Sequence, residues 1–272
     1  MLAILTRLGR RKIETATIAT FAAVSSIGLL SRDSYVAPAV VAATSTSIVA
    51  SEPATEPTKP VTPSEAYAFT NAFTNALSTR ATMGLPNIDH PLVTSWIKRF
   101  TTEQRGSFAT YLNRKARYEG MITKKLAARD MPQGLIYLAL IESGFNPTAK
   151  SPVKASGLWQ FMGPTAKEWG LTVSRKVDER NNPARSTDAA LRYLDRLHDT
   201  FGSWYLAAAA YNTGQGRVAR IMQQETGRTR GTDADYYRIS HRFSQETRDY
   251  VPKMIAAARI GTNPEQYGFR AN

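Results

Sequence analysis

Residues 133–142 read QGLIYLALIE, and this run decides the fold. Pro132, just before it, suits the first turn of a helix, because its φ angle is preset and its missing N–H is not needed there. Leu135 and Leu138 lie seven and four residues before Glu142, so the three side chains share one face of that helix. The run therefore predicts a buried helix that carries a carboxylate in its last turn.

The chain beyond residue 86 continues with helical periodicity. Apolar residues recur at helical intervals between Pro91 and Ala128, which predicts one or two amphipathic helices. Further helices are predicted over three segments: from a cap at Ser186 or Thr187 to Gly202, over 204–211, and over 247–260. No segment alternates apolar and polar residues as a strand would, so the predicted fold class is mainly α.

The first 85 residues have a different composition. Basic residues at positions 7 and 10–12 precede the uncharged stretch 15–31, which is shorter than the roughly 20 residues of a spanning helix. Residues 1–43 therefore predict a signal peptide or an N-terminal anchor. Residues 44–85 are rich in Ala, Ser, Thr and Pro and predict a linker, which leaves 86–272 as the folded domain.

The charge, cysteine and histidine content of the chain limits the partners and the catalytic chemistry that we expect. The formal net charge is +13, and residues 1–85 hold only seven basic and five acidic side chains, so the folded domain carries most of it. Such a balance favours polyanionic partners. The chain has no cysteine, which excludes disulfides, thiol catalysis and a lipidated Cys. Its three histidines lie far apart in sequence, so a His-rich metal site is not expected.

Glu142 is the first candidate catalytic residue. A carboxylate on a buried face pays a desolvation cost that favours the neutral acid, and a neutral acid at neutral pH is what general acid catalysis needs. The structural alternative is a helix-terminal Glu that reaches solvent or pairs with Lys150 or Lys154.

Three later motifs carry amides and aromatic rings suited to sugar binding. Gln160 follows Gly157-Leu-Trp, and Tyr211 and Asn212 stand at the end of an Ala-rich helix. Tyr250 lies on the last long helix. Each has a structural alternative, namely a core Trp at 159, a helix C-cap and a core Tyr.

Together these stretches, from about residue 135 to 269, resemble the catalytic domain of the lytic murein transglycosylases, which have a goose-lysozyme-like fold. The resemblance is carried by four motifs in order: Ile141-Glu-Ser-Gly-Phe-Asn-Pro147, Gly157-Leu-Trp-Gln-Phe161, Ala210-Tyr-Asn-Thr-Gly214 and Ser244-Gln-Glu-Thr-Arg-Asp-Tyr-Val251. A match to one such motif arises easily by chance, whereas four in the same order do not.

The resemblance implies a function and a role for each matched residue. Glu142 is then the single catalytic acid/base of a lyase that cleaves the MurNAc-β-1,4-GlcNAc bond of peptidoglycan strands and forms 1,6-anhydro-MurNAc. The saccharide groove is lined by Ser151, Gln160, Tyr211, Asn212 and Tyr250. The expected protein is an exported monomer of the bacterial periplasm or cell envelope, without cofactor. It departs from the family in lacking a lipobox Cys and LysM repeats after Asn272, so we expect membrane association only through the N-terminal segment.

Two further classes of function stay open at this stage. A hydrolysing muramidase or chitinase of the same fold would use water and a second carboxylate, with Glu168, Asp178 and Glu179 as the candidates. A non-catalytic scaffold would only bind the cell wall. A nucleic-acid binder is disfavoured, because the basic residues are dispersed over many helices and follow an export signal.

Overall fold

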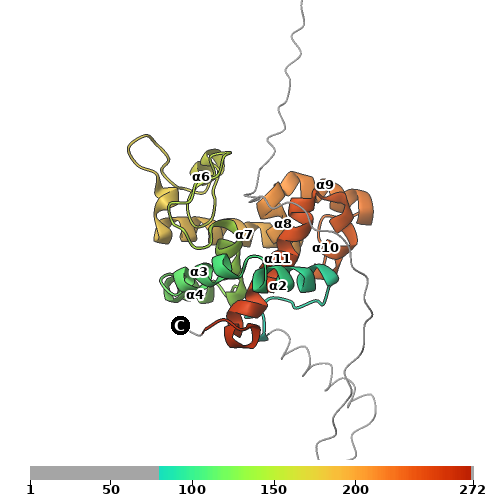
Figure 1. The fold of residues 1–272 in the computed structure, drawn as a ribbon. Coiled ribbons are helices and arrows are strands. Elements are labelled where there is room, and N and C mark those ends of the chain that lie inside the picture. The colour runs from blue at the N-terminus through green and yellow to red at the C-terminus, as the bar shows by residue number, and fades with distance from the viewer. Residues whose placement is uncertain (1–79, 271–272) are drawn as a thin grey trace, which may run out of the picture. The chain divides into compact units, whose positions relative to one another are not determined.

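The computed structural model describes residues 80–270, and within them it contains helices and isolated β-bridges but no strand. The predicted mainly α fold class is confirmed. Figure 1 shows the α-helices, which are α2 (Pro91–Thr101), α3 (Arg105–Lys115), α4 (Glu119–Ala127), α5 (Ile136–Ser143), α6 (Gly163–Glu168), α7 (Pro183–Phe201), α8 (Trp204–Thr213), α9 (Gln215–Thr226), α10 (Asp233–Ile239) and α11 (Gln245–Thr262). The short 3-10 helices are η1 (Gln133–Leu135), η2 (Glu179–Asn181), η3 (Ser240–Arg242) and η4 (Pro264–Tyr267).

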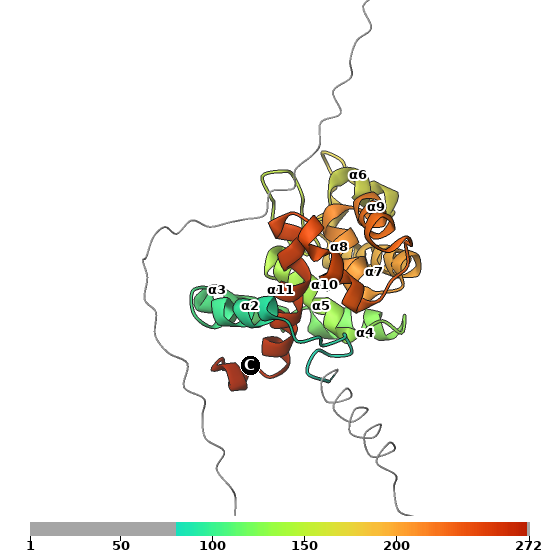
Figure 2. The same cartoon turned by 90° about the vertical axis from the view of Figure 1, so that its right-hand side faces the viewer.

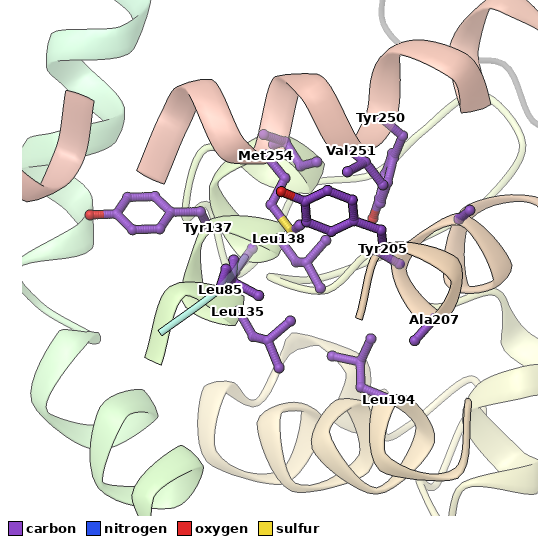
Figure 3. Packing of buried hydrophobic residues seen from close by; sticks show 14 of the residues in the cluster. Leu85, Leu135, Tyr137, Leu138, Leu194, Tyr205, Ala207, Tyr250, Val251 and Met254 are labelled. Carbon is purple, nitrogen blue, oxygen red and sulfur yellow. The ribbon is translucent and has the colours of Figure 1, made fainter. Parts of the chain in front are cut away.

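The stretch quoted above forms η1 and α5, which belong to the hydrophobic core. All residues from Ile136 to Ile141 are buried, so α5 is covered around its whole circumference. It packs against α11 and α4. In Figure 3, Leu138 lies beside Met254 of α11, while Leu135 points toward Leu194 of α7. This packing fixes the C-terminal end of α5, where Glu142 stands.

α7 begins earlier than predicted. Asn182 is its N-cap, because the Asn182 side chain accepts hydrogen bonds from the backbone N–H groups of Ala184 and Arg185, and Pro183 occupies the first helical position. The predicted caps, Ser186 and Thr187, are wrong. They lie inside the helix, and their hydroxyl groups donate to backbone carbonyls one turn earlier. The predicted end is confirmed, since Gly202 closes α7 with a φ of 71°.

The region predicted as one or two helices contains three, namely α2, α3 and α4. The chain leaves helical geometry at Thr102, whose φ and ψ are −119° and −89°, although neither Pro nor Gly marks that point. The break lets α3 fold back on α2, so that the rings of Phe100 and Phe108 lie 4.5 Å apart. Tertiary packing of large aromatic residues decides this boundary.

α8 and α11 complete the frame around the site, and both occupy the predicted segments to within two residues. The residues from Tyr205 to Ala210 of α8 are all buried, and both α7 and α11 pack against this helix. The last four of them are alanines, whose small side chains allow close packing. α11 also packs along α2, as Figures 1 and 2 both show.

Across residues 80–270, no helix is both long enough and apolar enough to cross a membrane. The predicted signal or anchor segment, 1–43, and nearly all of the predicted linker lie outside the described residues.

Candidate active site

Glu142 occupies the last turn of α5, and its carboxyl group meets α11. Gly144 ends the helix in the left-handed conformation, with φ 57° and ψ 37°. The Tyr250 hydroxyl donates a hydrogen bond of 2.5 Å to Glu142 Oε1. Tyr250 is 5% exposed, while Glu142 is half-buried. The two residues lie 108 positions apart in sequence, and the packing of α5 on α11 brings them together.

Burial dominates the proton affinity of Glu142. Desolvation raises the pKa of this carboxyl to about 7, against the lowering effects of the Tyr250 hydrogen bond and the Lys253 charge. The charge of Glu246 raises it further. Among the described residues, neither Lys150 nor Lys154 forms an ion pair with Glu142. With its pKa raised to about 7, the carboxyl group can carry a proton at neutral pH, which an ordinary glutamate does not.

Tyr211 stands near Glu142 at the end of α8. Its hydroxyl donates to the Trp159 carbonyl over 2.8 Å. Burial raises the pKa of Tyr211, and the charge of Glu142 raises it further, which reflects their proximity. Trp159 itself is fully buried, and its Nε1 donates to Thr187 Oγ1 over 2.9 Å. The core alternative for Trp159 is therefore confirmed.

Asn212 joins the end of α8 to the first turn of α11. Its Nδ2 donates to Glu246 Oε1 over 3.2 Å, and its Oδ1 accepts from Thr247 Oγ1 over 2.8 Å. Glu246 is thus a second carboxylate on the site, which the sequence reasoning missed. The available signal was its spacing, because Glu246 precedes Tyr250 by four residues and shares its helix face.

Lys253 is the second residue that the sequence reasoning missed. It lies three residues after Tyr250 on the same face of α11, and its Nζ is 5.3 Å from the centroid of the Trp96 ring on α2. The Arg99 guanidinium lies over the same ring at 4.6 Å. Burial lowers the pKa of Lys253, against the opposing effects of Glu142 and Glu246.

Ser151 and Gln160 hold the loop that follows α5. Ser151 Oγ accepts from the Ala155 N–H over 3.0 Å, and Gln160 Nε2 donates to the Ala149 and Gly157 carbonyls over 3.2 and 2.9 Å. No hydrogen bond joins either described side chain to Glu142. The structure thus brings Glu142, Tyr211, Asn212 and Tyr250 together, and it places Ser151 and Gln160 in the loop.

The packing around Gly157, the first residue of the motif 157–161, explains why this position is a glycine. Gly157 has a φ of 86°, and a Cβ there would lie 1.9 Å from the Arg180 carbonyl oxygen. Arg180 Nη1 in turn donates to the carbonyls of Lys154 and Phe161, over 2.8 and 3.0 Å. The chain around η2 therefore holds the loop against the site, and only glycine fits at this contact.

Two of the three candidate second carboxylates are engaged in ion pairs. Asp178 pairs with Arg180 at 2.7 Å, and the Arg180 hydrogen bond lowers the pKa of Asp178. Glu179 pairs with Arg185 at 3.1 Å and accepts from the Thr172 N–H, which lowers the pKa of Glu179. Glu168 is exposed on α6. In the described part of the chain, no group of three His, Asp or Glu side chains is arranged to hold a metal ion.

Comparison with known proteins shows what this chain is similar to. Residues 120–232 match the family described as "Transglycosylase SLT domain". The chain is 39% identical over 154 residues to membrane-bound lytic murein transglycosylase D of Escherichia coli K12, covering 56% of this chain and 33% of that protein. It is 34% identical over 145 residues to the soluble lytic murein transglycosylase of Salmonella typhimurium, covering 51% and 22%.

Among solved structures, the 70 kDa soluble lytic transglycosylase SLT70 of Escherichia coli matches with 30% identity and a TM-score of 0.45, over 55% of this chain and 24% of that one. The chain spans a third or less of the length of these relatives. The match at 120–232 includes Glu142, Ser151, Gln160, Tyr211 and Asn212. The resemblance drawn from four motifs is confirmed, since residues 120–232 match the transglycosylase SLT domain and the chain is 39% identical over 154 residues to a lytic murein transglycosylase.

Proposed function

We propose that this chain is a lytic transglycosylase that cleaves the glycan strands of peptidoglycan between MurNAc and GlcNAc. The observation that carries the proposal is Glu142, a carboxyl group with a pKa raised to about 7 and hydrogen-bonded by Tyr250, inside an SLT domain. Its relatives include proteins named as lytic murein transglycosylases. A general acid works best with a pKa near the operating pH.

In the first step, Glu142 acts as the acid. The Tyr250 hydroxyl donates to Oε1, which leaves Oε2 to carry the acidic proton. Transfer of this proton to O4 of GlcNAc accompanies cleavage of the bond between that oxygen and C1 of MurNAc. The Tyr250 hydrogen bond and the Lys253 charge stabilise the carboxylate that is left behind.

In the second step, the same carboxylate acts as the base. It takes the proton from the C6 hydroxyl of MurNAc, and O6 forms a bond to C1 that closes the 1,6-anhydro ring. Glu142 is then protonated again, and no water is consumed. The substrate supplies its own nucleophile, so one carboxyl group serves both steps.

The remaining predicted residues are proposed to bind the saccharide. Tyr211 and Asn212 end α8 beside Glu142, where an aromatic ring and an amide suit the apolar and hydroxyl faces of a sugar. Ser151 and Gln160 act from the loop that Gly157 and Arg180 hold in place.

A hydrolase is the second candidate, and Glu246 is the observation that favours it. Its carboxylate acts electrostatically on Glu142, which is the kind of arrangement that two-carboxylate glycosidases use. Against this, the Glu246 carboxylate accepts the Asn212 amide, which ties it to the helix junction.

Digestion of sacculi in ¹⁸O-labelled water, followed by mass spectrometry of the released muropeptides, tests the proposal. A transglycosylase leaves unlabelled 1,6-anhydro ends, because water takes no part. Stoichiometric ¹⁸O at C1 of MurNAc would overturn the transglycosylase and support the hydrolase. If no muropeptide were released, both enzyme hypotheses would fail, and the result would support a non-catalytic scaffold that binds the cell wall.

The substrate also sets the place of action, which is the bacterial cell envelope. The basic cluster and uncharged stretch in residues 1–43 would export the chain or anchor it, and we propose that it works there as a monomer. The net positive charge of the folded domain suits a polymer whose peptide stems carry carboxylates.

A further inference from the structure

The turn that directly follows the helix of Glu142 has a strained backbone. Gly144 and Phe145 both take the left-handed conformation, with φ angles of 57° and 56°. Glycine adopts this conformation at little cost, whereas a bulky residue such as phenylalanine rarely does. Phe145 is fully buried, and its N–H donates to the Ala139 carbonyl over 3.4 Å. Such strain persists only where the surrounding structure holds it in place.

Three side chains from α3 and from the start of α4 hold this turn. The Tyr111 ring lies so close to Gly144 that an added Cβ would overlap two of its ring carbons. Arg114 Nη1 donates to the Gly144 carbonyl over 3.5 Å. The ring of Tyr118 faces that of Phe145, with 6.5 Å between the centroids and 14° between the planes. We call Tyr111, Arg114 and Tyr118 the clamp.

The clamp lies outside the segment that matches the SLT family. That match covers residues 120–232 and includes Glu142, whereas Tyr111 and Arg114 belong to α3 and Tyr118 is the N-cap of α4. All three clamp residues are half-buried against the domain. The part of the chain that determines the place of the candidate acid is therefore larger than the matched segment.

The last turn of α5 depends on contacts of this kind, because the last carbonyls of an α-helix have no N–H partner within the helix. Glu142 and Ser143 lie in that turn. Ser143 Oγ donates to the Leu158 carbonyl over 2.9 Å, and the Tyr250 hydroxyl donates to Glu142 Oε1 over 2.5 Å. A shift of the turn would move the Glu142 carboxyl group relative to Tyr250 and to the bound strand.

We propose that the clamp positions Glu142 for proton transfer by holding the Gly144–Phe145 turn in its left-handed conformation. Tyr111, Arg114 and Tyr118 are positioning residues, because each acts through the turn. The inference rests on the proposed function and deepens it, since it adds α3 to the catalytic unit. Proton transfer is sensitive to such placement, and a displacement of about 1 Å can lower a rate by about 10²-fold.

Hydrogen exchange of the full chain, measured by mass spectrometry on peptides that cover residues 139–146, tests whether the clamp holds the turn. Tyr111→Leu removes the ring from Gly144, and Arg114→Met removes the donor to the Gly144 carbonyl. We expect both variants to exchange about tenfold faster in 139–146, because the turn opens more easily. Tyr111→Phe keeps the ring and should keep the slow exchange. Arg114→Met carries the test if Tyr111→Leu does not fold.

Kinetics on soluble glycan strands test whether the turn positions the acid. In Tyr111→Leu and Arg114→Met, kcat should fall by about tenfold or more and KM should stay unchanged, whereas Tyr111→Phe should keep both. The falling limb of the pH profile of kcat/KM should also move to lower pH. Burial is the largest cause of the raised pKa of Glu142, and a looser turn admits water.

A loss of folded protein alone would not move that limb. The other groups that act on the pKa of Glu142 are the same in all of these variants, namely Tyr250, Lys253 and Glu246. The limb therefore reports the surroundings of the carboxyl group, which the clamp is proposed to set.

The matched control is Tyr267→Leu, which removes a half-buried tyrosine that packs against the core from η4. It should leave the exchange of residues 139–146 and the pH profile unchanged, even where it lowers the melting temperature. Unchanged exchange in both clamp variants, an equal increase in Tyr267→Leu, or faster exchange with unchanged kcat and an unmoved limb overturns the clamp proposal. The proposed function fails by a separate result, which is the absence of 1,6-anhydro products from sacculi treated with the unsubstituted chain. The exchange measurement needs no turnover, so it decides whether the clamp holds the turn in that case too.

Discussion

Glu142 and Tyr250 are joined by a hydrogen bond of 2.5 Å, at a place where Tyr250 is buried and Glu142 is half-buried. In such surroundings the charged form of a carboxyl group is disfavoured, and its pKa rises. The hydrogen bond limits that rise and fixes one carboxyl oxygen. The residue can therefore both release and recover a proton near neutral pH, which is what a single acid/base requires.

Replacing Glu142 tests this role. Glu142→Gln keeps the size of the side chain and an oxygen that can accept from Tyr250, so the fold and saccharide binding should persist. Turnover of sacculi should fall by about 10³-fold or more, because one residue serves both steps. The measurement is muropeptide release together with thermal melting. Activity within tenfold of the unsubstituted chain would remove Glu142 from the mechanism.

Lys253 offers a test of the electrostatics. Its charge lowers the pKa of Glu142, so Lys253→Met should raise that pKa while keeping an aliphatic side chain beside Trp96. The first step needs the protonated acid, and activity falls as pH rises through the pKa. The falling limb of the pH profile of kcat/KM should therefore move to higher pH in Lys253→Met.

The matched control for Lys253 is Lys124→Met, which removes an exposed charge on α4 and should leave that limb in place. An unmoved limb in Lys253→Met, with rate and stability unchanged, would show that Lys253 has no electrostatic influence on the acid.

At the level of the element, α11 carries a proline that most helices would not tolerate. Pro252 has no N–H, so the Arg248 carbonyl loses its helical partner. The Tyr236 hydroxyl of α10 donates to that same carbonyl over 2.8 Å, and to the Thr247 carbonyl over 3.0 Å. The side chain replaces the missing hydrogen bond and holds the turn that precedes Tyr250.

Tyr236→Phe should therefore destabilise the domain by about 1–3 kcal/mol, the usual cost of leaving a buried carbonyl unsatisfied. The neighbouring Tyr237→Phe is the control, because the Tyr237 hydroxyl is buried and has no partner within residues 80–270. Its removal should be close to neutral. Chemical denaturation measures both. Equal stability of the two variants would show that the Tyr236 hydroxyl does not support α11.

Element packing also marks what the sequence could predict. Periodicity was sufficient to predict α5, α8 and α11. The motifs singled out Glu142 and Tyr250, and the structure joins these two side chains by a hydrogen bond. The sequence reasoning missed Glu246 and Lys253, because their importance arises only when α11 packs on α5 and α2. The break at Thr102 has no local signal and follows from the packing of Phe100 on Phe108. The start of α7 did have a local signal, because Asn182 is a common N-cap residue and Pro183 suits the first helical position. Ser186 and Thr187 are also common cap residues, and they were predicted instead.

At the level of the whole molecule, the catalytic proposal and the amino-terminal segment point to the same place. A chain that acts on peptidoglycan must reach the cell envelope, and residues 1–43 have the basic start and uncharged stretch of an export signal. The described structure begins at residue 80, and the site and the core both lie beyond that point. Targeting and catalysis should therefore be separable.

Deletion of residues 1–43 should leave the protein in the cytoplasm of the producing bacterium, because no other stretch combines a basic cluster with an uncharged run of that length. The purified variant should still cleave sacculi at close to the unsubstituted rate, since the helical domain is intact. Deletion of residues 44–64 serves as the control, because it removes a segment of linker composition and should preserve export. Cell fractionation with immunoblotting follows both variants. Recovery of the 1–43 deletion in the envelope fraction, at the level of the full chain, would refute the export assignment and require another route to the wall.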